Sequence, residues 1–97
     1  MPDRVPSPGE LDALLTRMVE QQRQKVLQAA RAKLPHLTPE DVLTPEAYPD
    51  LYFDGPFNYE DGIVNGLLTA QMAIRALVRE REEGDSGRKL AAPGTQV

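Results

Sequence analysis

Proline is the feature that most constrains what this chain can fold into. Its nine prolines leave two long segments, Glu10–Lys33 and Asn58–Glu83, free of the residue. Five of the nine fall in the connection between these segments, residues 35–57. Because proline is tolerated in the first turn of a helix and breaks its interior, and apolar residues recur at helical spacing in both segments, the sequence predicts an all-α fold. We expect two long antiparallel helices, a helical hairpin, with short helical turns in the connection.

The first long helix is expected from Pro8 to about Lys33. Ser7 and Glu10 have the spacing of a capping box, and Pro35 ends the segment. Gln22 lies in the middle of the apolar stripe, where it is either half exposed or hydrogen-bonded so as to fix register and oligomeric state. The apolar stripe covers about 160° of the helical wheel and consists of Leu11, Leu14, Leu15, Met18, Val19, Val26, Ala29, Ala30 and Ala32.

The second long helix is expected to begin after Asn58 as its N-cap and to end at about Glu83, with Gly84 as the stop signal. Its apolar and small residues cover more than half of the circumference, whereas one neighbouring helix needs a narrower stripe. The surplus predicts contacts with more than one neighbour. The residues concerned are Gly62, Ile63, Val64, Gly66, Leu67, Leu68, Ala70, Met72, Ala73, Ile74, Ala76, Leu77 and Val78.

Small residues at Gly62, Gly66 and Ala70 recur one turn apart in this second helix. Glycine costs nearly 1 kcal/mol in a helix interior, so two of them indicate a steric reason such as close backbone approach. The approaching backbone is either the first helix of the same chain or a second copy of the chain, and the sequence leaves both alternatives open.

Two helices in a chain of this length cannot enclose a core by themselves, so we expect a homodimer that forms a four-helix bundle. The domain is expected to span residues 8–83, between a flexible N-terminus (1–7) and a disordered tail (84–97). The expected packing and dimer interface consists of Leu11, Leu15, Met18, Gln22, Gly62, Ile63, Gly66, Leu67, Ala70, Ile74 and Leu77.

The connection is acidic and aromatic. Its two Thr-Pro-Glu sequences predict a short helix near residues 39–43 and a helical turn near 45–48. All five aromatic residues lie between Tyr48 and Tyr59, and residues 34–74 contain seven acids and no Lys or Arg. We expect Phe53 and Phe57 to be buried against the helix ends. The remaining side chains Asp50, Tyr52 and Asp54 are then predicted to stay accessible and to contact a basic protein surface.

Signatures of catalysis and of cofactor binding are absent from the sequence. It has no cysteine, a single histidine (His36), and no phosphate-binding loop, nucleophile elbow or zinc-ligand spacing. The acids from Asp50 to Asp61 resemble a calcium loop only loosely, since Tyr52 fills the third position. We therefore expect neither an enzyme nor a cofactor.

Composition and charge exclude some classes of partner. The sequence is acidic, with a pI of about 4.9, and the basic residues of the first helix are scattered around it, which argues against nucleic acid. With no signal-peptide pattern and no long apolar run, we expect a cytoplasmic protein without membrane contact. The sequence favours a non-catalytic interaction or assembly module acting as a homodimer. The alternative is a bundle that binds a small ligand or metal through the connection, residues 48–61.

Overall fold

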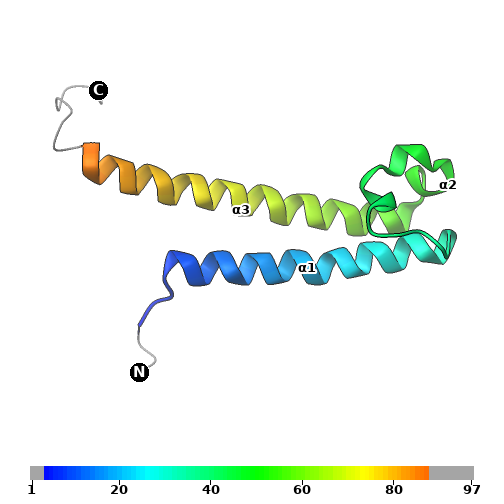
Figure 1. The fold of residues 1–97 in the computed structure, drawn as a ribbon, viewed down its shortest axis with the longest axis horizontal. Coiled ribbons are helices and arrows are strands. Elements are labelled where there is room, and N and C mark those ends of the chain that lie inside the picture. Colours follow the sequence, from blue (N-terminus) through cyan, green and yellow to red (C-terminus); the bar gives the residue numbers. More distant parts are fainter. Residues whose placement is uncertain (1–3, 88–97) are drawn as a thin grey trace.

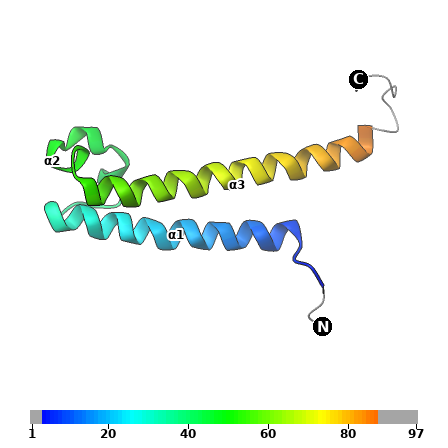
Figure 2. The same ribbon diagram turned by 180° about the vertical axis from the view of Figure 1, so that it is seen from behind.

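A computed structural model describes residues 4–87, and all regular secondary structure in this part of the chain is helical, without strands. Helices α1 and α3 run antiparallel side by side as a hairpin, so that the first turn of α1 and the last turns of α3 lie toward the same end (Figures 1 and 2). The expected all-α hairpin is confirmed. The elements are α1 (Pro8–Lys33), the 3-10 turns η1 (Asp41–Leu43) and η2 (Pro45–Ala47), the short helix α2 (Pro49–Tyr52), and α3 (Gly55–Gly87).

Helix α1 begins as its sequence predicts. Ser7 Oγ accepts a hydrogen bond from the Glu10 amide at 3.1 Å, and the Ser7 amide donates to Glu10 Oε1 at 2.7 Å. This reciprocal capping box satisfies two amides that the first helical turn leaves unpaired. The helix then runs to Lys33, before Pro35.

Helix α3 is longer at both ends than the sequence predicts. It begins at Gly55, because Asp54 Oδ2 accepts from the Phe57 amide at 3.0 Å and so caps the helix ahead of Asn58. The expectation that Asn58 is the N-cap is wrong: its side-chain amide donates to the Tyr52 carbonyl at 2.9 Å. Pro56 does not interfere, since proline is accepted in the first helical turn.

Gly84 does not stop α3, which continues to Gly87. A glycine ends a helix when it takes a left-handed conformation, and no glycine in the described range has a positive φ. Residues 84–87, expected to begin the tail, are therefore helical. The remainder of the expected tail, 88–97, and residues 1–3 lie outside the described residues.

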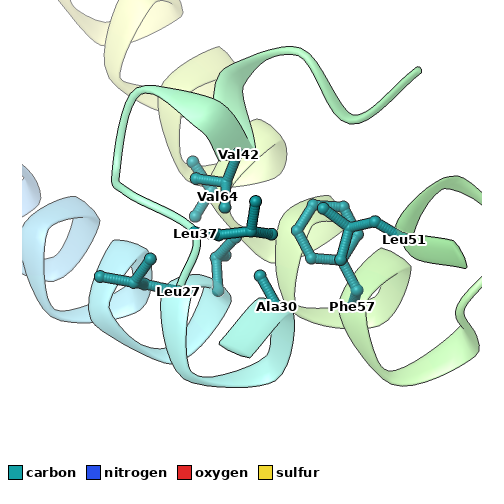
Figure 3. Packing of buried hydrophobic residues seen from close by; sticks show 8 residues of the cluster. Leu27, Ala30, Leu37, Val42, Leu51, Phe57 and Val64 are labelled. Carbon is teal, nitrogen blue, oxygen red and sulfur yellow. The ribbon is translucent and has the colours of Figure 1, made fainter. Parts of the chain in front are cut away.

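The hydrophobic core lies at one end of the hairpin. We call this the closed end, where the connection joins the two helices, and the opposite end the open end. Figure 3 shows side chains from α1, the connection and α3 meeting around Leu37, Leu51 and Phe57, each at most 2% exposed. The buried residues of this core are Val26, Leu27, Ala30, Leu37, Val42, Leu51, Phe57 and Val64.

The two phenylalanines of the connection have opposite environments. Phe57 is fully buried, as predicted, but Phe53 is 80% exposed, and the prediction that it is buried is wrong. Phe53 follows the single turn of α2, and its ring packs edge-on against Tyr52 at a centroid distance of 5.0 Å. Leu51, two residues earlier, is the residue of this segment that is buried in the core.

The hairpin is elongated and one layer of helices thick. Its Cα radius of gyration is 19.5 Å, whereas a compact domain of this length has about 12.5 Å. Only the closed end, where the connection folds back over the helices, encloses residues from three directions (Figure 1). The open end has only α1 and α3 to cover its apolar side chains.

A candidate self-association face

The seam between α1 and α3 changes from apolar to polar along its length. Near the closed end Val26 and Ala30 of α1 are buried in the same core as Phe57 and Val64 of α3. The next contact toward the open end is polar, since Gln22 Nε2 donates to the Glu60 carbonyl at 3.0 Å and to Glu60 Oε1 at 2.6 Å. Gln22 is only 7% exposed. The expectation of a half-exposed side chain is therefore wrong, and the partner that fixes its position belongs to the same chain.

The open half of the seam is held by a polar network. Gln71, 4% exposed, donates from Nε2 to Thr16 Oγ1 at 2.9 Å and to the carbonyl and Oδ1 of Asp12 at 3.3 Å. Arg75 adds a paired contact, with Nε 2.6 Å from Asp12 Oδ1 and Nη2 3.0 Å from Oδ2. The hydrogen bond from Arg75 lowers the pKa of Asp12 below its ordinary value of 3.8. This network was not predicted, although Asp12/Thr16 and Gln71/Arg75 share one-turn spacing.

Because polar residues occupy most of the open half of the seam, much of each apolar stripe lies beside it. Each residue advances about 100° around a helix. Relative to Asp12 and Val19, which face α3, Leu11 and Met18 lie about 90° round α1. On α3, Gln71 faces α1, and the apolar stripe around Ile63 and Ile74 lies at a similar angle from Gln71. Viewed from the N-terminus of each helix, the stripes of α1 and α3 are displaced from the seam in the same rotational sense. Since the helices are antiparallel, equal rotations bring both stripes to the same side of the hairpin.

This side forms one continuous surface, here called the apolar face. Its larger side chains remain partly accessible: Leu14 is 44% exposed, Ile74 37% and Leu77 50%. Measured around each helix axis, no charged residue lies within about 50° of the middle of the apolar stripe. This holds along residues 11–22 of α1 and along residues 62–78 of α3. The apolar face consists of Leu11, Leu14, Leu15, Met18, Ile63, Leu67, Ala70, Ile74 and Leu77.

All but three of the expected interface residues lie on the apolar face. Gln22 lies between that face and the seam, Gly66 on its outer edge, and Gly62 farther round, away from α1. A Cβ atom placed on Gly62 or Gly66 would meet nothing within 4 Å. Close packing of these glycines against α1 is therefore excluded within the chain, which leaves the second copy as the open alternative. Leu14 belongs to the face although the expected interface omitted it.

The second expected site, at the tip of the hairpin, is only partly assembled. Tyr52 is 50% exposed and Asp50 is exposed. Asp54 is 9% exposed because it caps α3 and lies 3.4 Å from Lys33 Nζ. The prediction that Asp54 is accessible is wrong. A helix-capping carboxylate could have been recognised from Asp54-Gly55-Pro56, which is a helix-start sequence.

Within residues 4–87 no three His, Cys, Asp or Glu side chains are grouped so that they could hold a metal ion. In the same part of the chain, no helix combines the length and apolar character needed to cross a membrane. No family model matches the chain, and searches of curated proteins and of solved structures find no significant match.

Proposed function

We propose that this chain is a non-catalytic assembly module that acts as a homodimer, in which two hairpins pack apolar face to apolar face as a four-helix bundle. The apolar face supports this proposal most directly. A row of partly exposed Leu, Ile and Met side chains along two adjacent helices is more than a monomer ordinarily leaves uncovered. A second layer of helices would complete the core that the open half lacks.

The size of the apolar face is close to that of a specific interface. On α3 the face extends from Ile63 to Leu77, about 21 Å, and it is two helices, or about 20 Å, wide, which gives a flat area of about 420 Å² per hairpin. Two copies would cover about 840 Å² of flat area. The accessible area of ridged helices is larger than this flat area, which brings the interface near the roughly 1,000 Å² that a specific interface needs.

A second copy fits the face better than an unrelated protein. An isologous interface is built from one patch that is complementary to itself, and a patch without charges meets its own copy without like-charge repulsion. Ala70 lies near the centre of the face, and Gly66 lies one turn before it. These small residues permit two α3 helices to approach closely, and Gly66 has free space around it in the single chain.

The test compares one substitution on the two sides of the hairpin. Met18 lies on the apolar face, whereas Met72 lies on the opposite side of α3 and is 66% exposed. In sedimentation equilibrium, wild-type protein and the M72E variant should have twice the chain mass of 10.7 kDa. The M18E variant should have the mass of a monomer, because dimerisation would bury its carboxylate in the interface. A wild-type chain that is monomeric at tens of micromolar, or an M18E variant as dimeric as M72E, would contradict the proposal.

A further inference from the structure

A pocket lies on the side of the hairpin opposite the apolar face. It opens where η1 crosses over the groove between α1 and the first turns of α3, and its volume is about 200 Å³. Its apolar walls include Val26, Leu27, Val42 and Val64, all of which belong to the buried core. The pocket is therefore shaped by side chains that are already fixed by packing.

The rim of the pocket combines one exposed apolar residue with an excess of negative charge. Leu43 is 64% exposed there. The carboxylates of Glu20 and Asp61 also line the pocket, against a single guanidinium from Arg23. Two further acids, Glu40 and Asp41, directly precede Val42 in η1.

The volume indicates the kind of occupant. Pockets that hold small-molecule ligands usually measure about 300–1,000 Å³, so a pocket of 200 Å³ is small for such a ligand. It is large enough for one leucine or phenylalanine side chain. Single apolar or aromatic side chains that fill preformed pockets are the common anchors of protein–protein interfaces.

We propose that this pocket receives one apolar side chain from a basic segment of another protein, with the carboxylates of Glu20 and Asp61 facing the cations that flank the anchor. The inference rests on the interaction role proposed above. It does not depend on dimerisation, because the pocket lies on the side of the hairpin that the proposed dimer leaves open. It also places the binding of a basic partner beside η1 instead of at the tip.

The chain's own sequence Arg88-Lys89-Leu90 has the matching chemistry, but it cannot fill the pocket of the same molecule. From Val64 to Gly87 helix α3 rises about 35 Å toward the open end, and the three residues that follow span at most about 10 Å. These three residues can therefore reach such a pocket only in another molecule.

The experiment uses three short synthetic peptides: one of Arg, Lys and Ser with a central Phe, the same peptide with Ala in place of Phe, and a peptide of Glu and Ser with the same Phe. Fluorescence anisotropy at low and high salt gives affinities, and amide shifts in NMR spectra locate the site. The basic Phe peptide should bind at least about tenfold more tightly than its Ala counterpart. It should shift the amides of Val42 and Val64, and salt should weaken it.

Variants distinguish this site from the tip and from the dimer. E20Q and D61N should each weaken the basic Phe peptide, whereas D50N at the tip should leave its affinity unchanged. All three are repeated in the M18E background, so that loss of the dimer and loss of peptide binding are observed separately. The proposal is overturned if Phe and Ala peptides bind equally, if the acidic peptide binds as well as the basic one, or if D50N alone weakens binding.

Discussion

The closed and open halves of the hairpin differ in where their apolar side chains lie. In the closed half, Val26 and Ala30 share a buried core with Phe57 and Val64, and the connection supplies Leu37 and Leu51 as a cover. In the open half, most contacts between the helices are polar, as between Thr16 and Gln71 and between Asp12 and Arg75, and Val19 is the buried apolar residue among them. The apolar side chains of that half lie to one side and stay partly exposed.

This difference in packing indicates which half can be stable in a single chain and which half leaves apolar side chains for a second chain to cover. An apolar core gains free energy for every side chain removed from water, so the closed half can be stable in a single chain. Polar contacts contribute less net stability, although they are specific in geometry. The polar seam thus fixes the register of α1 against α3, while the apolar face beside it remains available to a second layer.

The largest expected effect tests the closed half. F57A should lower the free energy of unfolding by about 3–5 kcal/mol, because it leaves a cavity in a fully buried site. F53A removes the same side chain four positions earlier, where it is 80% exposed, and should change stability by less than about 0.5 kcal/mol. Chemical denaturation measures both variants, and equal losses would mean that the closed half is not the stable part of the hairpin.

The second prediction tests the open half through its glycines. Within one hairpin, G62L and G66L should each raise helix stability by about 0.5–1 kcal/mol, since a Cβ atom at either position meets nothing within 4 Å. Across the proposed interface, G66L should instead weaken the dimer by about 1–3 kcal/mol through overpacking, whereas Gly62 lies outside it. Dissociation constants from sedimentation separate the two cases. A G66L dimer as tight as the G62L dimer would remove Gly66 from the interface.

The smallest effect concerns the polar seam at low pH. The Arg75 hydrogen bond holds the pKa of Asp12 below its ordinary value of 3.8. Stability from this pair is therefore complete above that value and is lost as pH falls through the lower pKa of the folded state. In R75Q the pKa of Asp12 should rise toward its ordinary value, and this part of the acid dependence should disappear. NMR titration of the Asp12 carboxyl in both proteins checks the shift directly.

Several local features could be read from the sequence because they depend on neighbours a few residues away. These features are the Ser7–Glu10 capping box, the end of α1 before Pro35 and the 3-10 turns at or just after the two Thr-Pro-Glu sequences. Each involves side chains and backbone groups only a few residues apart. The N-cap of α3, in contrast, is not determined locally. Asp54 and Asn58 are both residue types that cap helices well, and Asp54 takes the position between Leu51 and Phe57, which are both buried in the core.

The sequence by itself determined the two amphipathic helices and the acidic, aromatic connection, since helical periodicity and proline position are properties of the chain alone. Only the tertiary structure decided which part of each stripe meets the other helix. Gln22 and Gln71 are buried in the seam because each finds a hydrogen-bond partner across it, and burial of a polar group is tolerated only with such a partner. That pairing turns Leu14, Met18 and Ile74 outward, which a helical wheel cannot foresee because it contains no second helix.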